Sequence, residues 1–291
     1  MIIDSHAHYA HKSFSGEFSY LAEGTQGFEA RRGDLAALFG ELKAAGIVAS
    51  VEPGVTLASN EVILAMSRDL PIFPAVGVHP TRAVQERWRD RRALEALSRR
   101  PGVVAIGETG LDYHMTHLNR SQQHRIRQLG WFVYQLELAR KRDLPVILHV
   151  RDAHPQALRV LRHYRGKLRG VAHCFSGDEA LGREYVALGW HLGIGGTLLQ
   201  TGVRAERLRR VVEVTPLERL LPETDSPFIL PDCSGTIPGK ARRRMRNTSL
   251  ILPAVIREVA AIKGIPEDRA REALTRNVIA LFRLPLTNED P

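Results

Sequence analysis

The repeated alternation of short apolar runs with longer amphipathic stretches is the feature that most constrains the fold. Eight runs have the length and composition of buried strands: Ile2–Ser5, Ile47–Val51, Ile72–Gly77, Val103–Gly107, Pro145–Val150, Gly170–Ala172, His191–Ile194 and Leu217–Leu221. Helical patterns lie between and behind them, at Asp34–Ala45, Asn60–Ser67, Arg91–Arg100, Gln122–Arg142, Pro155–Tyr164, Glu179–Leu188, Glu206–Glu213, Pro253–Lys263 and Pro266–Phe282. Strands that alternate with helices indicate a parallel sheet, and eight repeats predict an α/β fold of the TIM (β/α)8 barrel type.

An open doubly wound sheet is the structural alternative, but no GxGxxG motif follows the first run. The chain has 291 residues, and α/β barrels of such length occur as one unit. No change in composition marks a linker. We therefore predict a single barrel domain over residues 1–291.

The formal net charge of +9 favours a polyanionic partner such as nucleic acid. However, 35 of the 41 basic residues are arginine, which a GC-rich genome would also produce. One run is denser, because Lys240–Arg246 (KARRRMR) holds five cations in seven residues and follows a loop rich in Gly and Pro. This run is either solvated surface or a contact with a DNA backbone.

The sequence predicts a cytoplasmic protein without a membrane segment. Met1 is followed at once by a strand-like IID rather than by the pattern of a signal peptide, and no stretch approaches the about 20 apolar residues of a membrane span. The two cysteines, Cys174 and Cys233, lie far apart and form no CxxC motif, so we expect a reducing compartment.

Potential metal ligands gather where the predicted strands end. They are His6 and His8 after the first run, His79 after the third, Glu108 after the fourth, His149 and His173 at the fifth and sixth, and Asp225 after the eighth. Barrel enzymes carry their chemistry at the C-terminal ends of the strands. A lone buried histidine is more often a hydrogen-bonded core residue, but packing does not explain why these residue types recur at successive strand ends.

The individual signals differ in strength. Side chains alternate along a strand, so His6 and His8 share one face and His11 falls outside the pair. Glu108 ends an apolar run, and a carboxylate rarely enters an apolar core without a partner. Imidazole and carboxylate together suit Zn, Mn, Fe or Mg. Six such ligands favour two ions about 3.5–4 Å apart, bridged by a carboxylate and a water.

The chain resembles the TatD family of metal-dependent hydrolases, within the amidohydrolase superfamily. The motifs that carry the resemblance run almost from end to end: IDSHAH, AVGVHP, AIGETGLDYH, PVILHVRDA, AHCFSG, GWHLGIGGT, LERLLPETDSPFILP and NVIALF. The resemblance implies a barrel with two or three divalent cations, Mg, Mn or Zn, and hydrolysis of phosphodiesters. The implied partner is a DNA substrate, single-stranded or presented as a 3′ end, and the activity is typically that of an exonuclease.

The resemblance also implies roles for single residues. His6 and His8 hold one ion with Asp225 nearby, His149 and His173 hold the second, and Glu108 bridges the two. Asp225 and Glu108 are then the catalytic carboxylates, with Asp225 as the proton acceptor for the attacking water. His79 resembles a position that lines the pocket near the substrate phosphate.

Three further residues are candidates for the rim of the site. Arg151 follows His149 by two positions and either clamps a phosphate or is a solvated loop residue. Tyr113 and His114 follow the GLD turn, and we expect Tyr113 to line the mouth.

Two segments depart from the family pattern. His11–Gly33 is longer than the family's usual first loop and contains Phe14, Phe18, Tyr20 and Phe28. These rings cap the site, stack on a base or pack on the barrel, and packing is the favoured interpretation. After the eighth strand, the chain reads Arg246–Ser249 (RNTS) where the family tends to have Arg-Asn followed by Glu-Pro.

Two rival functions remain open at this point. The same ligands would serve a hydrolase of an ester, lactone or aminoacyl bond, because barrel folds host many chemistries. A non-catalytic nucleic-acid-binding scaffold is the second rival, and the intact set of six ligands argues against it. The sequence does not predict the oligomeric state.

Overall fold

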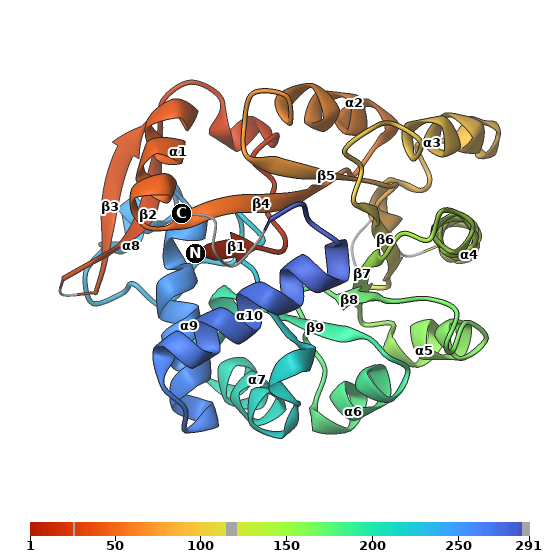
Figure 1. Cartoon of the computed structure of the whole chain (residues 1–291). Helices are drawn as coiled ribbons and strands as arrows, with labels where there is room; N and C mark the ends of the chain where they lie inside the picture. Colours follow the sequence, from red (N-terminus) through yellow and green to blue (C-terminus); the bar gives the residue numbers. More distant parts are fainter. Residues whose placement is uncertain (26, 115–120, 287–291) are drawn as a thin grey trace.

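Eight parallel strands form a ring with helices around its outside (Figure 1). The computed structural model describes residues 1–25, 27–114 and 121–286. The strands are hydrogen-bonded in the order β1 (Ile2–Asp4), β4 (Ile47–Pro53), β5 (Ile72–Val76), β6 (Ala105–Asp112), β7 (Val146–Arg151), β8 (Gly170–Ala172), β9 (His191–Ile194) and β10 (Leu220–Pro222). The prediction of a (β/α)8 barrel is confirmed.

Backbone contacts just beyond β1 and β10 close the ring. Ser5 N–H donates to the Pro222 carbonyl at 3.0 Å, and His8 N–H donates to the Ser226 carbonyl at 2.8 Å. Ala7 and Ser226 form a parallel bridge. The first and last strands therefore meet at the end of the barrel where the predicted ligands lie.

The helices cover the outside of the ring. They are α1 (Leu35–Ala44), α2 (Leu57–Met66), α3 (Arg91–Leu97), α4 (Gln122–Arg142), α5 (His154–Arg162), α6 (Glu179–Ala187), α7 (Val203–Val214), α8 (Gly239–Arg242), α9 (Leu252–Lys263) and α10 (Glu267–Phe282). Local chemistry sets several starts; for example, the Asp34 carboxylate accepts the Ala37 N–H at 2.9 Å and caps α1. None of the described helices is both long and apolar enough to cross a membrane.

One predicted strand begins later than expected. Leu217–Arg219 forms a 3-10 turn, and only Leu220–Pro222 pairs with β9. The reason is that the Asn277 side chain donates to the Leu217 and Leu220 carbonyls, both at 2.9 Å, and holds the turn against α10.

The barrel interior has an apolar layer at one end and a polar layer at the other. The apolar layer takes one or two residues from most strands: Ile3, Ala49, Val51, Ala75, Ala105, Ile147, Val171 and Leu221. Val278, Leu281 and Phe282 of α10 pack against this layer, and Figure 1 shows α10 crossing the ring. The residues two positions further along the chain are polar: His149 follows Ile147, His173 follows Val171, and Glu223 follows Leu221. Period two thus carries polar side chains into the opposite end of the same interior.

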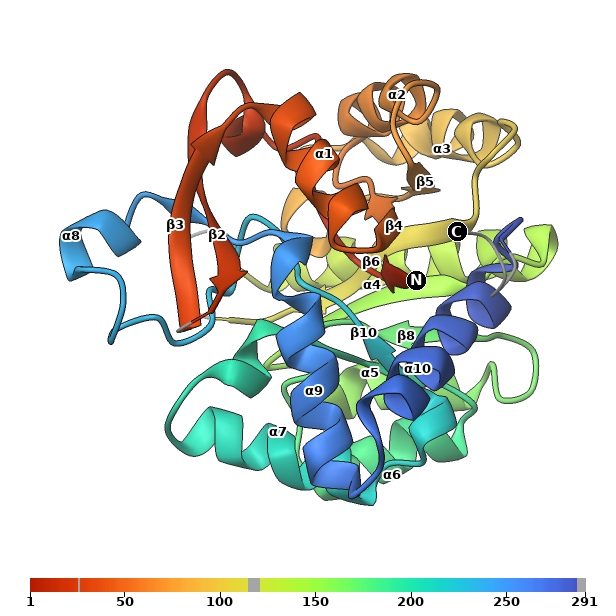
Figure 2. The same cartoon turned by 60° about the vertical axis from the view of Figure 1, so that its left-hand side comes forward.

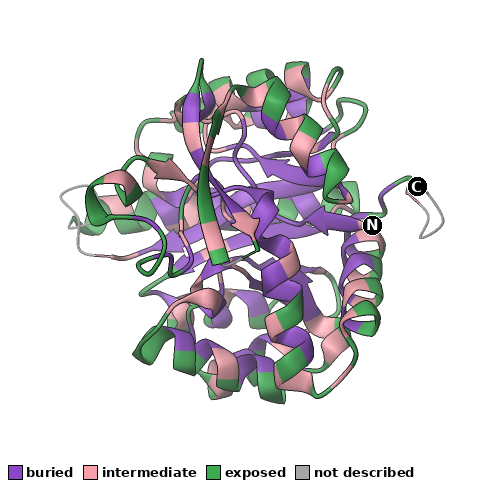
Figure 3. Cartoon of the chain, turned by 90° about the vertical axis from the view of Figure 1, so that its left-hand side faces the viewer, coloured by how far each residue is buried: buried purple, intermediate pink, exposed green. Residues whose placement is uncertain are grey.

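The long first connection is a β-hairpin rather than an irregular loop. β2 (Phe18–Gly24) pairs antiparallel with β3 (Gly27–Gly33), and β11 (Met245–Arg246) adds parallel to β2. This accessory sheet lies outside the barrel together with α8 (Figure 2). β3 is largely exposed, whereas the barrel strands behind it are buried (Figure 3).

The aromatic residues of this connection mostly pack. Phe14, Phe18 and Tyr20 are at most 5% exposed, and neighbouring rings in the series lie 5.1 and 5.6 Å apart. Phe28 is half-buried and lines a groove between the hairpin and α8. The favoured expectation of packing therefore describes three of the four rings.

Candidate metal centre

The predicted ligands converge at the C-terminal end of the barrel. His6 and His8 directly follow β1, His149 lies in β7, and His173 directly follows β8. Asp225 lies in the turn after β10, where its N–H donates to the His6 carbonyl at 2.9 Å. The closing contacts of the barrel thus place Asp225 beside the first two histidines.

Glu108 lies within its strand, and the expectation that it ends the strand was wrong. β6 continues to Asp112, with a shift of register between Ile106 and Thr109. The strand passes close to β7, because a Cβ on Gly110 would lie 2.0 Å from the His149 carbonyl oxygen. This irregular stretch lets a buried carboxylate enter the barrel without ending the sheet.

The two oxygens of Glu108 face two groups of imidazoles. Glu108 Oε2 lies 3.7 Å from His6 Nε2 and 3.6 Å from His8 Nε2. Glu108 Oε1 lies 2.7 Å from both His149 Nδ1 and His173 Nε2. One carboxylate therefore stands between two sets of nitrogen ligands.

Three overlapping clusters in the described part of the chain have the composition and spacing of a metal site. They are His6, His8 and Asp225; His6, Glu108 and His173; and His79, Glu108 and His149, with the ligand atoms of each cluster within 4.8 Å of one another. Asp225 Oδ1 lies 3.5 Å from His6 Nε2 and 3.4 Å from His8 Nε2. His79 Nε2 lies 3.3 Å from Glu108 Oε1. His79, which was expected near the substrate phosphate, thus lies close enough to Glu108 and His149 that the three could hold one ion together.

Asp112 was not among the predicted ligands. Its Oδ2 atom lies 3.3 Å from His149 Nε2, so one ring nitrogen of His149 faces Asp112 and the other faces Glu108. Gln128 holds the Asp112 backbone through two hydrogen bonds of 2.9 and 3.0 Å. The sequence held a signal for Asp112, because this residue and Glu108 are an even number of residues apart on one strand and therefore face the same side.

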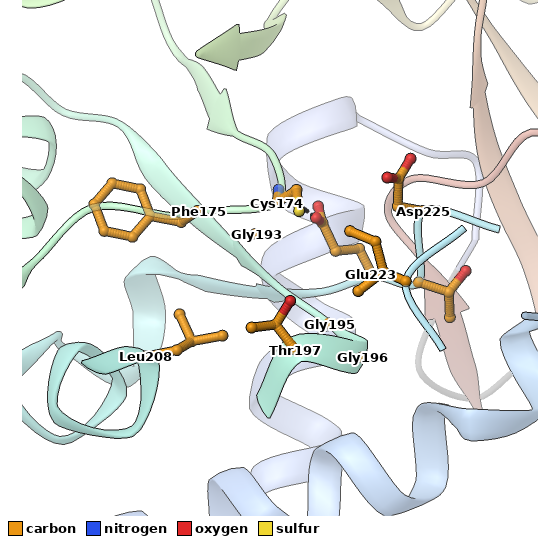
Figure 4. A pocket seen from close by; sticks show the side chains of 11 residues that line it. Cys174, Phe175, Gly193, Gly195, Gly196, Thr197, Leu208, Glu223 and Asp225 are labelled. Carbon is orange, nitrogen blue, oxygen red and sulfur yellow. Dashed lines mark hydrogen bonds between the residues drawn. The ribbon is translucent and has the colours of Figure 1, made fainter. Parts of the chain in front are cut away.

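Glu223 is a second residue that the sequence analysis missed. Its carboxyl group accepts the Cys174 N–H and lies 3.8 Å from His173 Nδ1. Figure 4 shows Glu223 beside Cys174 in a small cavity that Asp225 also lines. A Cβ on Gly193 would lie 2.1 Å from Glu223 Oε2, so glycine there makes room for this carboxyl. The sequence held one signal for Glu223. It lies two residues after Leu221, so alternation along the strand places both side chains on the same face.

Two further buried carboxyl groups fix the backbone around His6 and His8. Asp4 accepts hydrogen bonds from the His6 N–H at 3.0 Å and from the Ser249 hydroxyl at 2.6 Å. Glu52 accepts the N–H groups of Tyr9 and Ala10 at 2.9 and 2.7 Å. Burial raises the pKa of Asp4 to about 6 and that of Glu52 to about 7. These contacts explain why the chain turns where it does after β1.

The surroundings of Glu108 and His6 lower the pKa of both groups. Burial alone would raise the pKa of Glu108, but the charges of His79 and His173 hold it well below its usual range. Burial, and then the charge of His173, hold the pKa of His6 well below its usual range. Glu108 is therefore ionised and His6 is neutral, which are the forms that bind metals.

Two other imidazoles carry protons when no cation is present. Burial alone would lower the pKa of His8, but the hydrogen bond to Asp225 and the charge of Glu108 raise it to about 9. Burial opposes protonation of His149 as well, but Asp112 and Glu108 raise its pKa to about 9.

The remaining candidates lie at the rim. Arg151 is exposed at the end of β7, and its carbonyl accepts the Tyr113 N–H at 2.8 Å. The Tyr113 ring is covered by the Arg125 guanidinium at 4.6 Å from the ring centre. His114 pairs with Asp152 at 2.8 Å. These contacts place Arg151 and Tyr113 beside one another at the mouth.

Comparison with known proteins agrees with this geometry. A family model described as TatD related DNase matches residues 3–283. A relative from Cronobacter sakazakii, named 3′-5′ ssDNA/RNA exonuclease TatD, is 38% identical over 253 residues, which cover 86% of this chain and 90% of the relative. The uncharacterized metal-dependent hydrolase YcfH of Escherichia coli is 33% identical over 226 residues, covering 76% of this chain and 77% of its own.

Solved structures show the same architecture. The crystal structure of YJJV, a TatD homolog from Escherichia coli, is 29% identical, covers 98% of both chains and gives a TM-score of 0.81. A dihydroorotase is similar in fold alone, with 16% identity, a TM-score of 0.56 and coverage of 97% of this chain and 82% of its own. The fold of this chain is therefore shared with amidohydrolase-type barrels.

Proposed function

Because the chain belongs to the TatD-related DNase family, we propose that it is a metal-dependent hydrolase that trims single-stranded DNA or RNA from a 3′ end. The observation that carries the proposal is the position of Glu108, with one oxygen facing His6 and His8 and the other facing His149 and His173. A carboxylate between two sets of nitrogen ligands is the arrangement that a pair of divalent ions requires.

The residues fit a metal pair. His6 Nε2 and His8 Nε2 point at each other across 3.0 Å, with carboxylate oxygens on two sides. Imidazole and carboxylate donors suit Mn or Zn, and also Mg. We infer that His6, His8 and Asp225 would hold one ion and that His149 and His173 would hold a second, with the Glu108 carboxylate available to both.

When bound, the ions supply Lewis acidity toward a phosphoryl oxygen and lower the pKa of the attacking water. Asp225 takes the proton from that water as its oxygen bonds to phosphorus. The P–O bond to the neighbouring nucleotide breaks, and Asp225 returns the proton to the leaving alkoxide. The Asp225 side chain is 16% exposed, so both water and substrate reach it.

Other side chains position the groups that react. Asp112 fixes the orientation of the His149 ring through Nε2. His79 Nδ1 lies 2.7 Å from Thr81 Oγ1, so its other nitrogen remains directed at Glu108 and at the phosphate that binds there. Arg151 and Tyr113 at the mouth would contact the substrate backbone, since a guanidinium pairs well with phosphate oxygens.

The experiment that tests the proposal is the substitution Asp225→Asn. We expect kcat on a 5′-labelled single-stranded oligonucleotide to fall at least about 100-fold, because general-base catalysis contributes about 10²–10⁴-fold. Metal content by elemental analysis should stay close to wild type. Asp152→Asn is the matched control, since Asp152 lies at the same rim and is 62% exposed. Wild-type turnover by the Asp225 variant would show that the base is misassigned.

The same assays separate the rival functions. Oligonucleotides, simple esters and lactones are offered in parallel with Mg, Mn and Zn. Faster cleavage of an ester or lactone than of any oligonucleotide would favour the carbonyl hydrolase, and absence of both metal and activity would favour the scaffold. A cytoplasmic location, inferred from the free Cys174 and Cys233, stays a prediction.

A further inference from the structure

An exposed aromatic ring stands at the entrance of the metal centre and is not used by the mechanism. Phe228 is 47% exposed. Its ring centre lies 6.2 Å from that of His8 and 5.4 Å from that of His11. This half-exposed ring therefore lies beside a candidate metal ligand, where a nucleotide bound at the metal centre would reach it.

The backbone around Phe228 is held rigidly to the accessory sheet. Phe228 N–H donates to the Asp225 carbonyl at 2.8 Å. On the other side, Asn247 N–H donates to the Pro227 carbonyl at 3.0 Å, and the Asn247 amide donates to the Ile229 carbonyl at 3.2 Å. Asn247 follows β11 directly, so the position of Phe228 is tied to the strand that carries the basic run.

Contacts continue from Phe228 to the basic run without a break. His11 Nδ1 lies 2.9 Å from Ser13 Oγ, and Arg246 Nε donates to the Ser13 carbonyl at 3.3 Å. Arg246 pairs with Tyr20 in the accessory sheet, and α8 with Lys240 precedes it. Aromatic and cationic side chains therefore follow one another outward from the metal centre.

Among the described residues, no carboxylate is in ion-pair contact with the cations of α8 and the turn behind it. In the described ranges, no carboxylate lies within 4.0 Å of the charged groups of Lys240, Arg242, Arg243 or Arg244, and all four residues are exposed. The arginines of β3 differ, because Arg31 pairs with Glu29 and Glu41, and Arg32 with Glu17. Within the hairpin and α8, the cations without a carboxylate partner therefore lie on the α8 side, next to the loop of Phe228.

We propose that Phe228, Arg246 and the cations Lys240, Arg242 and Arg243 form a track for single-stranded nucleic acid. A base of the strand stacks on Phe228 at the metal centre, and phosphates further along the strand lie over α8. The groove between Phe28 and Ala241, beside these cations, gives bases a second place to rest. The track rests on the proposed function and gives the accessory sheet a role in substrate binding.

Stacking is tested by pairing Phe228→Ala with an altered substrate. The probes are a 12-nucleotide single strand and the same strand with abasic residues at its two 3′-terminal positions, which keep the charge but remove the bases. We expect Phe228→Ala to lower kcat/KM about tenfold on the ordinary strand, the loss of about one stacked base, and far less on the abasic strand. Phe228→Tyr should retain the wild-type ratio. Equal losses on both strands would overturn the proposal.

The charged part is tested by salt dependence. We expect Lys240→Gln, Arg242→Gln and Arg243→Gln together to reduce the slope of log kcat/KM against log salt by about 2, because each phosphate contact on a single strand contributes about 0.7. The control removes three exposed arginines near the other end of the barrel, Arg68, Arg269 and Arg276. A slope that changes equally in both triple variants overturns the track.

Failure of the proposed function gives a different result. If the wild-type protein degrades neither strand with Mg, Mn or Zn, the proposed nuclease activity is wrong, and the track is wrong with it. If the wild-type protein degrades both strands and the variants behave like their controls, the nuclease activity stands and only the track is wrong.

Discussion

At the scale of single residues, two imidazoles of the candidate site, His149 and His79, are oriented by a group at each ring nitrogen. His149 has Glu108 on one side and Asp112 on the other. His79 has Thr81 opposite Glu108. A ring held at both nitrogens cannot rotate, which keeps its lone pair directed at the centre of the barrel.

His191 gives a prediction on stability against pH that is independent of the metal centre. It lies at the start of β9, and burial, followed by the charge of Arg219, lowers its pKa to about 4. The unfolded chain takes up this proton near pH 6.5, but the folded protein does so only near pH 4. The unfolded state thus binds more protons in this window, so stability falls as the pH drops from about 6.5 to about 4.

The measurement is the free energy of unfolding in urea at several pH values between 7 and 4.5. His191→Gln should lose less stability than the wild type over this range, because it lacks the proton that favours unfolding. His163→Gln, an exposed histidine of the same type, is the control and should follow the wild type. Parallel curves for wild type and the His191 variant would contradict the prediction.

At the scale of elements, α10 stabilises the end of the barrel that carries no chemistry. Phe282 is 2% exposed and packs with Leu281 and Val278 against the apolar layer of the barrel. We expect Phe282→Ala to reduce the free energy of unfolding by about 3–5 kcal/mol, as for other buried Phe-to-Ala changes. Urea unfolding measures the loss. The kcat of the folded fraction should not change, and Arg276→Ala on the exposed side of α10 should alter neither quantity by much.

The elements also show what a sequence can and cannot reveal. The eight barrel strands could be predicted because each is an apolar run between helical patterns, and His149 and His173 could be placed because alternation along a strand is strict. β3 reads GFEARRG and has no apolar alternation, since its pairing with β2 stabilises it rather than its own burial. Contacts between Phe18–Gly24 and Met245–Arg246 are remote in sequence, and local patterns do not encode them.

Asp112 and Glu223 illustrate the same limit within the candidate site. Both follow a recognised strand at the right parity, but a carboxylate there is equally typical of a solvated loop. Only the arrangement of the strands in the sheet shows that Glu223 meets His173 and that Asp112 meets His149. Alternation along a strand predicts which face a side chain lies on, but its role depends on the residue that it contacts in the folded protein.

At the scale of the whole molecule, the proposed metal ligands come from strands along almost the entire chain. The unfolded chain therefore cannot present His6, Glu108 and Asp225 together, and ions should bind the folded state far more tightly. At about 100 times the dissociation constant, such binding adds about 2.7 kcal/mol to stability.

We therefore expect removal of divalent ions with EDTA to lower the melting temperature by about 5 °C or more for a chain of this size. Differential scanning calorimetry after dialysis, followed by titration with Mn, Zn or Mg, measures the effect and ranks the ions. His8→Ala should weaken the recovery, whereas His163→Ala should recover fully. A melting temperature that none of the three ions changes would contradict the metal centre.

The closure of the barrel also bears on when the enzyme becomes active during its own synthesis. Ala7 bridges Ser226, and Asp4 accepts a hydrogen bond from Ser249, so residues near the start of the chain meet partners made more than 200 residues later. A ribosome-bound chain that stops before Asp225 holds His6 and His8 but neither the third residue of their cluster nor the last strand that closes the ring. An unfinished chain of this kind therefore lacks the complete candidate metal site, and we expect it to have no hydrolytic activity.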